Sequence, residues 1–378
     1  MANNFDGDIP EDIVREILLR LPVKLLLQYT SVCKTWLSII TSPDFISSHT
    51  HRALMVSLID PTLLAIRGVD ELIISGVDEL MLFSRARGGL TNNNNNNHSN
   101  TKFDRLVVPH LFGIKPLVVN SCNGIICLAN LANQNDLVYL WNPSIRKCRK
   151  LPDPPRRRSF RFKIGFGYDS ISADYKVVRC DYDYDYLRYF EAKVHVYSTN
   201  ADCWRKIRPN IPLEYQRLGR ANLVVNGVVY FQDNDELISF DLHKESFGRI
   251  PLPGSRRLQL SYVLDFEGAV AMVFGYVGDE VGAHLWTLDD VSGQLPWTKR
   301  FSIDADMDSG LWLRCYLRGE QFCGRITNKK TYDVYNILYN YKKKETKLYR
   351  IDRDDSTVLT GMIHTETLVS LGGFEQLE

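Results

Sequence analysis

A strand pattern that recurs along most of the chain is the feature that most constrains its fold. In each copy a Gly-led apolar strand comes first, an apolar–aromatic–polar triplet follows, and a further strand ends near a basic residue. The polar members of the triplets are Asn142, Ser198, Asp241, Thr287 and Asn340, which lie 56, 43, 46 and 53 residues apart. A period near 40–50 residues with several short strands is typical of propeller blades. The pattern therefore predicts a mainly β, propeller-like fold.

Strands outside these copies could complete the ring. Residues 53–121 could supply a further unit, and residues 364–371 have the pattern of one late strand. Pairing of that strand with residues 54–58 would close the ring and remove exposed sheet edges. The irregular spacing of the repeats leaves a β-sandwich and an open solenoid as alternatives.

Residues 9–49 differ from the rest of the chain because they alone show a clear helical period. Pro10 suits the first turn of a helix, and Pro22 would end that helix. The apolar positions that fall on one face between them are Ile13, Ile17, Leu18 and Leu21. About 40 residues cannot bury much of a core alone. The segment is therefore either a helical cap on the next domain or a module that completes its core against a partner.

The residues of this helical segment resemble an F-box. The matching stretches are, in order, Ile9-Pro10-Glu11-Asp12-Ile13, Ile17-Leu18-Leu19-Arg20-Leu21-Pro22, Val32-Cys33-Lys34-Thr35-Trp36 and Ser42-Pro43-Asp44-Phe45. Leu25 replaces a common Ser, and Gln28-Tyr29 stands where Arg-Phe is frequent. The resemblance implies docking on a Skp-type adaptor and, through it, on a cullin and a RING subunit. The residues expected to contact the adaptor are Pro10, Ile13, Ile17, Leu18, Leu21, Pro22, Leu26, Val32, Cys33 and Trp36.

The later units resemble the F-box-associated domain (type 1) of plant F-box proteins. The stretches that carry this resemblance are Ser121-Cys122-Asn123-Gly124-Ile125-Ile126-Cys127-Leu128, Trp141-Asn142-Pro143-Ser144, Gly165-Phe166-Gly167-Tyr168-Asp169, Asp174-Tyr175-Lys176-Val177-Val178-Arg179 and Ser239-Phe240-Asp241-Leu242. The resemblance implies a small N-terminal α-helical F-box followed by a β-propeller-like (kelch-like) domain. These motifs do not separate S-locus F-box proteins, which act in self-incompatibility, from members that act in defence or development.

The expected division of the chain follows from both resemblances. Residues 1–50 form the F-box, residues 51–104 form a connecting region, and residues 105–378 form the propeller-like domain. Six consecutive Asn lie within residues 91–100. Such a polar tract cannot repay its ordering entropy, so we expect a loop there.

Charge, apolar runs and cysteine spacing limit the partners and the compartment that we expect for this protein. The chain has 46 Lys and Arg against 45 Asp and Glu, whereas binding to nucleic acid through phosphates usually needs a basic excess. The first residues are polar and acidic, unlike a secretory signal, and no apolar run is long enough for a membrane span. Eight Cys are widely spaced in a chain that needs no disulfides to fold. We expect a cytoplasmic or nuclear protein with no nucleic-acid or membrane partner.

The sequence offers no constellation for catalysis or for a metal. Gly165-Phe166-Gly167 lacks the third Gly of a dinucleotide loop, and no Walker loop, Gly-x-Ser-x-Gly or His-Glu-x-x-His motif is present. Cys122 and Cys127 are too widely spaced within one strand-like run to suggest a metal site, so we expect core thiols. We therefore expect no catalytic residue, metal or cofactor. Because propellers can host hydrolases at the central channel, an enzyme with a helical cap remains the rival reading.

Two charged segments are candidates for contact with a target protein. Residues 146–163 hold nine basic residues and one acid, and residues 181–191 alternate acids with Tyr. Both could be solvated loops. Because Tyr and Arg often anchor protein interfaces, they could also form a contact surface. The residues expected to bind the target are Tyr182, Asp183, Tyr184, Asp185, Tyr186, Arg156, Arg157 and Arg158.

These resemblances imply a function without chemistry of its own. The chain would be the substrate-recognition subunit of a Skp–cullin–F-box ubiquitin ligase, and its C-terminal β-domain would hold a target for ubiquitination and degradation. A non-degradative scaffold, in which the F-box serves assembly only, is the second alternative.

Overall fold

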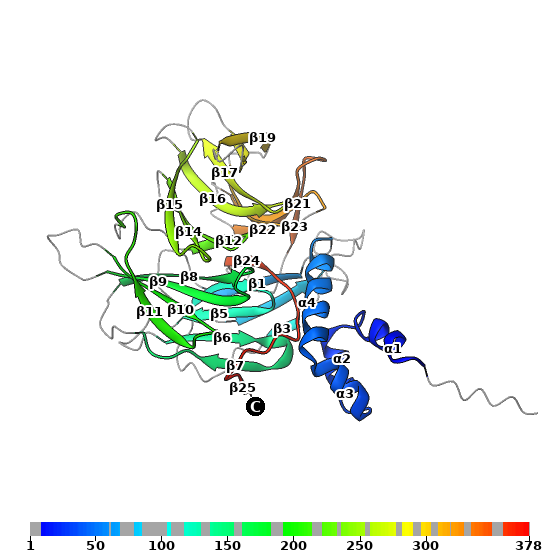
Figure 1. The fold of residues 1–378 in the computed structure, drawn as a ribbon. Helices are drawn as coiled ribbons and strands as arrows, with labels where there is room; N and C mark the ends of the chain where they lie inside the picture. Colours follow the sequence, from blue (N-terminus) through cyan, green and yellow to red (C-terminus); the bar gives the residue numbers. More distant parts are fainter. Residues whose placement is uncertain are drawn as a thin grey trace, which may run out of the picture.

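A computed structural model describes most of the chain. The described residues are 9–59, 62–68, 79–84, 104–106, 117–129, 137–154, 161–182, 192–213, 221–232, 236–253, 258–276, 282–289, 296–303, 309–317, 319–328, 334–349 and 358–377. They form an N-terminal group of helices beside a larger body of antiparallel sheets (Figure 1). The helices are α1 (Glu11–Leu18), α2 (Val23–Tyr29), α3 (Lys34–Thr41) and α4 (Pro43–Ser57). We refer to residues 9–59 as the helical module.

The described strands form six sheets, which we number as blades in chain order. Blade 1 contains β24 (Val358–His364), β1 (Thr62–Gly68), β2 (Glu79–Ser84) and β3 (Asp104–Leu106). Blade 2 contains β4 (Leu117–Cys122), β5 (Ile125–Ala129), β6 (Val138–Asn142), β7 (Lys147–Lys150) and β25 (Glu375–Gln376), with the 3-10 helix η2 (Pro143–Ile145) before β7. Blade 3 contains β8 (Arg161–Asp169), β9 (Asp174–Tyr182), β10 (Lys193–Ser198) and β11 (Cys203–Ile207).

The other three blades have four strands each. Blade 4 contains β12 (Ala221–Val225), β13 (Val228–Gln232), β14 (Glu236–Asp241) and β15 (Ser246–Pro251). Blade 5 contains β16 (Leu258–Phe266), β17 (Ala269–Tyr276), β18 (Gly282–Leu288) and β19 (Trp297–Ile303). Blade 6 contains β20 (Ser309–Tyr316), β21 (Gln321–Asn328), β22 (Val334–Asn340) and β23 (Glu345–Tyr349).

The blades close into a ring. One edge strand of each blade contacts the edge strands of the blades on either side, in the order β4, β8, β12, β16, β20, β24 and back to β4. Closure distinguishes this arrangement from an open solenoid and from two packed sheets. The expected mainly β fold with N-terminal helices and a propeller is therefore confirmed.

The strand that closes the ring is not the expected one. β24 pairs antiparallel with β1, with Leu64 opposite Met362, so the last strand of the ring completes the first blade. Residues 54–57 belong instead to α4, and residues 365–371 form no strand. The predicted pairing of 364–371 with 54–58 is thus wrong. Blade 1 also takes strands from both sides of the boundary expected at residue 105.

Turn chemistry explains the repeat seen in the sequence. In blades 2, 4, 5 and 6 the Gly that opens the copy lies in the hairpin between the first two strands, whereas Gly165 of the remaining copy lies within β8. Asn123 and Gly124 both have positive φ, 49° and 83°, as a type I′ turn requires. The polar member of the triplet closes the turn after the third strand in blades 2, 3, 4 and 6, whereas Thr287 of blade 5 lies within β18. Asp241 Oδ1, for example, accepts hydrogen bonds from the backbone N–H groups of His243 and Lys244.

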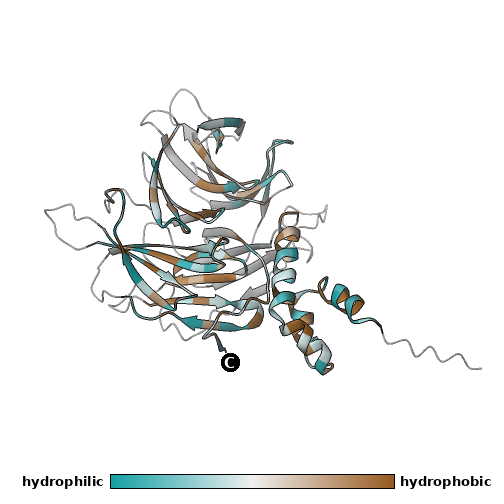
Figure 2. Ribbon diagram, in the orientation of Figure 1, coloured by the Kyte–Doolittle hydropathy of each residue, from teal (hydrophilic) through white to brown (hydrophobic). Residues whose placement is uncertain are grey.

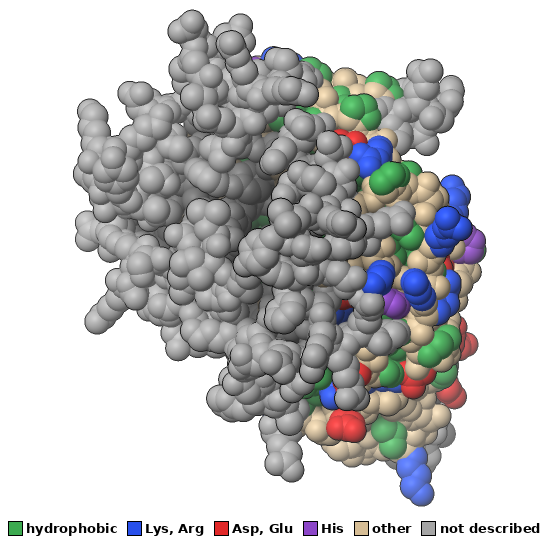
Figure 3. Space-filling model, turned by 90° about the vertical axis from the view of Figure 1, so that its left-hand side faces the viewer, with side chains coloured by type: hydrophobic (Ala, Val, Ile, Leu, Met, Phe, Trp, Pro, Cys, Tyr) green, Lys and Arg blue, Asp and Glu red, His purple; other side chains and the backbone are tan. Residues whose placement is uncertain are grey.

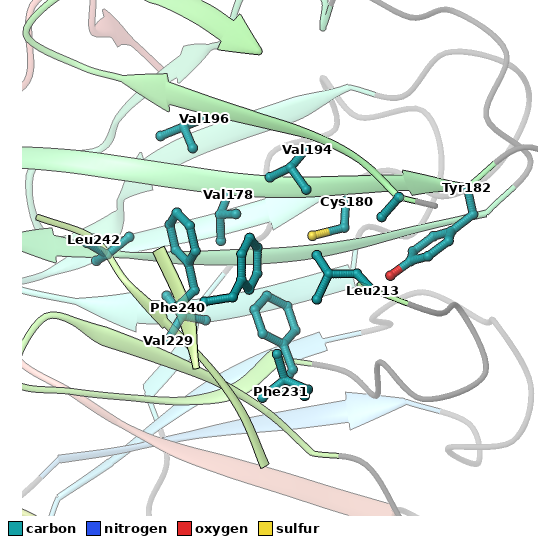
Figure 4. Packing of buried hydrophobic residues seen from close by; sticks show 13 residues of the cluster. Val178, Cys180, Tyr182, Val194, Val196, Leu213, Val229, Phe231, Phe240 and Leu242 are labelled. Atoms are coloured by element: carbon teal, nitrogen blue, oxygen red, sulfur yellow. The ribbon is translucent and has the colours of Figure 1, made fainter. Parts of the chain in front are cut away.

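The apolar core lies in layers between neighbouring blades. Between blades 3 and 4, Val178 and Val196 pack against Val229 and Phe240, and the Phe240 ring lies 4.6 Å from that of Phe247 (Figure 4). Similar layers lie between blades 2 and 3, 4 and 5, and 5 and 6. Aromatic side chains thus pack between sheets, as the triplets predict.

Candidate functional site

The helical module divides its apolar side chains between an interior and an exposed surface. Leu18, Leu26 and Phe45 are almost completely buried. Ile13 and Ile17 of α1 are 51% and 52% exposed, and Val32 is 58% exposed. Figure 1 places α1 on the side of the module that faces away from the propeller, and Figure 2 shows hydrophobic and hydrophilic residues on this helix. Exposed side chains of this size indicate a surface made for a partner.

The exposed residues of α1 follow from its helical spacing. Ile13 and Ile17 lie one turn apart and so share one side, while Leu18 turns toward the interior. The helix begins after Pro10, and Glu11 and Asp12 in its first turn favour the positive end of the helix dipole.

A second exposed apolar group surrounds the start of α3. Cys33 is the N-cap residue, and its Sγ accepts a hydrogen bond from the backbone N–H of Trp36 at 3.5 Å. The Trp36 ring packs edge-on against Tyr29 of α2, with centroids 5.4 Å apart. Val32 and Leu37 remain exposed on either side of this cap. The start of α3 therefore carries two exposed apolar side chains beside its cap.

Polar contacts fix the helices relative to one another. The Arg15 guanidinium of α1 forms an ion pair with Asp44 and donates to Ser48 Oγ of α4 at 3.3 Å. His49 Nε2 contacts the Leu21 carbonyl oxygen at 3.0 Å. Burial lowers the pKa of His49 below its ordinary value of 6.5, which favours a neutral imidazole in this position. These contacts hold α1 and Leu21 against α4, so the exposed surface lies on helices that are fixed relative to one another.

The ten residues expected to bind an adaptor separate into three groups. Those on the surface are Pro10, Ile13, Ile17, Pro22, Val32 and Cys33, and those half-buried are Leu21 and Trp36. Leu18 and Leu26 are instead core residues, because they are buried with Phe45 in one cluster. Their assignment to the contact surface is wrong. Sequence reasoning also missed the exposed Ile9, Leu27 and Leu37.

The residues expected to bind a target are mostly outside the described part of the chain. Asp183, Tyr184, Asp185 and Tyr186, and likewise Arg156, Arg157 and Arg158, lie there. Tyr182 is described and is only 3% exposed, with its ring beside Leu213 in the layer between blades 3 and 4 (Figure 4). Its assignment to a contact surface is wrong, because β9 continues through this residue with every side chain buried.

Charges at the start of the same segment are also internal. Asp181 is buried and forms an ion pair with Arg179 at 2.7 Å, and it contacts His195 Nδ1 at 3.1 Å. The Arg179 guanidinium stacks 4.0 Å from the centre of the Phe162 ring. The interpretation of residues 181–191 as a solvated loop is therefore wrong for Asp181 and Tyr182.

On one side of the molecule, basic, acidic and apolar side chains of the described residues are interspersed (Figure 3).

Side chains that could bind a metal do not cluster among the described residues. No group of three or more His, Cys, Asp or Glu in this part of the chain could hold a metal ion. Cys127 is fully buried, and burial raises the pKa of its thiol, as expected for a core residue. Within the same residues, no helix has the length and apolar character needed to cross a bilayer.

Comparison with known proteins gives matches to both parts. Residues 7–48 match the F-box domain, and residues 72–360 match the F-box associated beta propeller domain. The chain is similar to an F-box/LRR-repeat protein of Arabidopsis thaliana, at 26% identity over 91% of this chain and 77% of that protein. It is also similar to the F-box protein CPR1 of Arabidopsis thaliana, at 30% identity over 78% of this chain and 73% of that protein. Among solved structures, a nidogen/laminin complex matches 82% of this chain and 99% of that chain, with 9% identity and a TM-score of 0.44.

Proposed function

Because the chain belongs to the F-box proteins that carry an F-box-associated β-propeller, we propose that it is the substrate-recognition subunit of a Skp–cullin–F-box ubiquitin ligase. The helical module binds a Skp-type adaptor and, through it, a cullin and a RING subunit. The propeller holds a target protein for ubiquitination. The chain itself performs no chemistry in this proposal.

The observation that carries the proposal is the exposed apolar surface of the helical module. Ile13 and Ile17 form one side of α1, and Val32 precedes α3, so large side chains remain in water on elements that are otherwise well packed. Covering the exposed half of a side chain of this kind stabilises a complex by about 1 kcal/mol. An adaptor that buries all three would gain a large part of its affinity here.

A pull-down of the full chain with a Skp-type adaptor tests this step. The double change Ile13→Ser and Ile17→Ser is expected to reduce the recovered adaptor by about tenfold or more, given the burial energy of two isoleucines. Ile171→Ser is the matched control, because Ile171 is more exposed than either residue but lies in the turn between β8 and β9. Equal recovery by a folded double variant and by the control would contradict adaptor binding through α1.

Target capture is proposed for the two charged segments that the sequence singles out. Tyr184 and Tyr186, alternating with Asp183 and Asp185, suit a basic protein surface through hydrogen bonds and cation–π contacts. We propose that these residues, with the basic stretch at 156–158, form part of the target-binding face. Changing both Tyr to Ala and both Asp to Asn is expected to abolish target capture while adaptor binding survives.

The proposed gain for ubiquitin transfer comes from proximity. Tethering a target beside the ligase raises its effective concentration without any catalytic group on this chain. All eight cysteines are unpaired, which supports action in the reducing cytoplasm or nucleus. For a degradative receptor, deletion of the F-box is expected to lengthen the half-life of the target. If the full chain binds the adaptor but the deletion leaves the target half-life unchanged, the scaffold function is favoured.

A further inference from the structure

The last residues of the chain run between the two parts of the molecule. After β24 ends at His364, residues 365–377 pass from blade 1 across blade 2 and end at β25 (Figure 1). We call this segment the C-terminal strap. It is the part of the chain that follows ring closure, so it is not needed to complete the ring.

Polar contacts hold the first half of the strap on blade 2. The Asn142 side-chain amide, which is fully buried, donates to the carbonyl oxygens of Thr367 at 3.0 Å and Val369 at 2.9 Å. Thr367 Oγ1 in turn donates to the Asn123 carbonyl oxygen at 2.9 Å. Asn142 is the polar member of the first triplet, and its Oδ1 also accepts from the Ser144 backbone N–H at the start of η2. One side chain thus joins the strap to η2.

Backbone pairing holds the second half. In β25, Glu375 pairs with Cys148 of β7, and the Leu377 backbone N–H donates to the Arg146 carbonyl oxygen at 2.9 Å. The Arg149 guanidinium donates to the Gly372 carbonyl oxygen. The strap is therefore fastened to blade 2 at both ends.

Apolar side chains of the strap face two different bodies. Leu368 is buried in the same cluster as Leu26 and Phe45 of the helical module. Val369 and Leu371 pack instead against the layer between blades 2 and 3, and Phe374 packs against both. The strap thus has one apolar side in the helical core and another in the propeller core.

The propeller meets the helices at the same place. Helix α2 contacts η2, and Ile145 of η2 is buried in the cluster that contains Leu26 and Leu368. Without the strap, the helical core would lose Leu368 and Phe374 and keep Ile145 as its propeller contact within this cluster. Leu368 is thus the buried contribution of the strap to the helical core, and Phe374 is a half-buried one.

We propose that the C-terminal strap is a clamp that fixes the helical module on blade 2, so that the adaptor-binding surface and the propeller keep one relative orientation. The inference goes beyond the proposed function, because it concerns the joint between the two parts and its test contains neither adaptor nor target. A receptor with a fixed joint presents its target at one distance from the ligase, which is what proximity needs to be productive.

Two native cysteines allow a direct test. Cys33 in the helical module and Cys203 in blade 3 are exposed, whereas the other six cysteines are buried or partly buried. Spin labels on these two thiols of the full chain report the distance between module and propeller by pulsed electron resonance. The unaltered chain is expected to give one narrow distance distribution. The double change Leu368→Ser and Phe374→Ser is expected to roughly double its width, because the helical core would then keep Ile145 as its contact with the propeller in this cluster.

The control keeps the strap but alters a residue that does not face the helices. Ser370→Ala changes an exposed side chain of the strap and is expected to leave the distribution narrow. If the melting temperature of the double variant shows that the propeller itself has unfolded, Leu368→Ala is measured in its place. A distribution that stays as narrow as that of the unaltered chain, in a folded Leu368 variant, would overturn the clamp.

Discussion

Lys176 and Asp169 form a buried ion pair at the junction of blades 3 and 4, with Nζ 3.0 Å from Oδ2. The ammonium also donates to the Leu242 carbonyl oxygen of blade 4 at 2.7 Å and faces Glu245 at 3.3 Å. Burial alone would raise the pKa of Asp169, but hydrogen bonds from Ser172, Lys176 and His243 outweigh it and hold the pKa well below its ordinary value. The pair therefore joins two neighbouring blades in its charged form.

Removing the cation from this pair is expected to destabilise the propeller. Lys176→Met leaves the Asp169 carboxylate buried with fewer partners, at an expected cost of about 3–5 kcal/mol. Lys244→Met is the matched control, because Lys244 also faces a carboxylate, that of Asp241 at 3.6 Å, but is largely exposed. Its expected cost is at most about 1 kcal/mol. Urea denaturation of both variants measures the difference, and equal costs would contradict the bridging role.

Acid is expected to weaken the ring at its closing strand. His364 of β24 is buried, its Nδ1 lies 2.8 Å from Ser121 Oγ of β4, and its Nε2 has no hydrogen-bond partner among the described residues. Burial lowers the pKa of His364 from 6.5 to about 4. The unfolded chain therefore takes up this proton first as the pH falls. The stabilisation is complete above about pH 6.5 and is lost progressively toward pH 4, by up to about 3 kcal/mol.

Stability measured by urea denaturation between pH 7 and pH 4 checks this expectation. His364→Gln is expected to lose about 3 kcal/mol less than the unaltered chain over this interval, since it has no proton to gain. His51→Gln, which removes an exposed imidazole of α4, is expected to keep the pH dependence of the unaltered chain. The prediction fails if the His364 variant is as acid-sensitive as the His51 variant.

Two glycines in equivalent turns separate backbone strain from contact with the strap. Gly124 and Gly268 have almost the same φ, +83° and +85°. A Cβ on Gly124 would overlap Thr367 Oγ1 and lie 2.9 Å from the Thr365 carbonyl oxygen, whereas a Cβ on Gly268 would meet no atom within 4 Å. Both changes to Ala are expected to cost about 1–2 kcal/mol from the left-handed backbone. Gly124→Ala is expected to cost about 1–3 kcal/mol more, as overpacking does.

Thermal denaturation of the two glycine variants measures this difference. The melting temperature of Gly124→Ala is expected to lie several degrees below that of Gly268→Ala. Equal melting temperatures would show that Thr367 can move away from the added Cβ without loss of stability.

Neighbouring leucines of α2 test the division between core and surface in the helical module. Leu26 is fully buried and Leu27 is 39% exposed. Leu26→Ala is expected to destabilise the module by about 2–5 kcal/mol, and Leu27→Ala by less than about 1 kcal/mol. Hydrogen exchange of the backbone amides in α2 and α3 reports the local stability. Similar protection in both variants would show that Leu26 does not support the helical core.

Local patterns in the sequence determined the types of element and much of the proposed surface. Asn123-Gly124 predicts a tight turn, and a triplet that ends in Asp241 predicts the end of a strand, because both depend on hydrogen bonds within a few residues. The spacing of Ile13 and Ile17 likewise places them on one side of a helix. These features need only the 2.0 and 3.6 periods of the backbone.

Which face of each element is covered was decided only by the tertiary structure. Leu18 and Ile17 are adjacent, and both are apolar, yet Leu18 is buried and Ile17 is exposed, because Phe45 and Leu26 cover one side of α1 and not the other. Tyr182 is in an acidic, Tyr-rich segment but is buried, because β9 extends to this residue and its ring packs in the layer between blades 3 and 4. The pairing of β24 with β1 and the contact of Leu368 with the helices join residues about 300 positions or more apart. No local pattern encodes such contacts, because they depend on which surfaces the completed ring brings together.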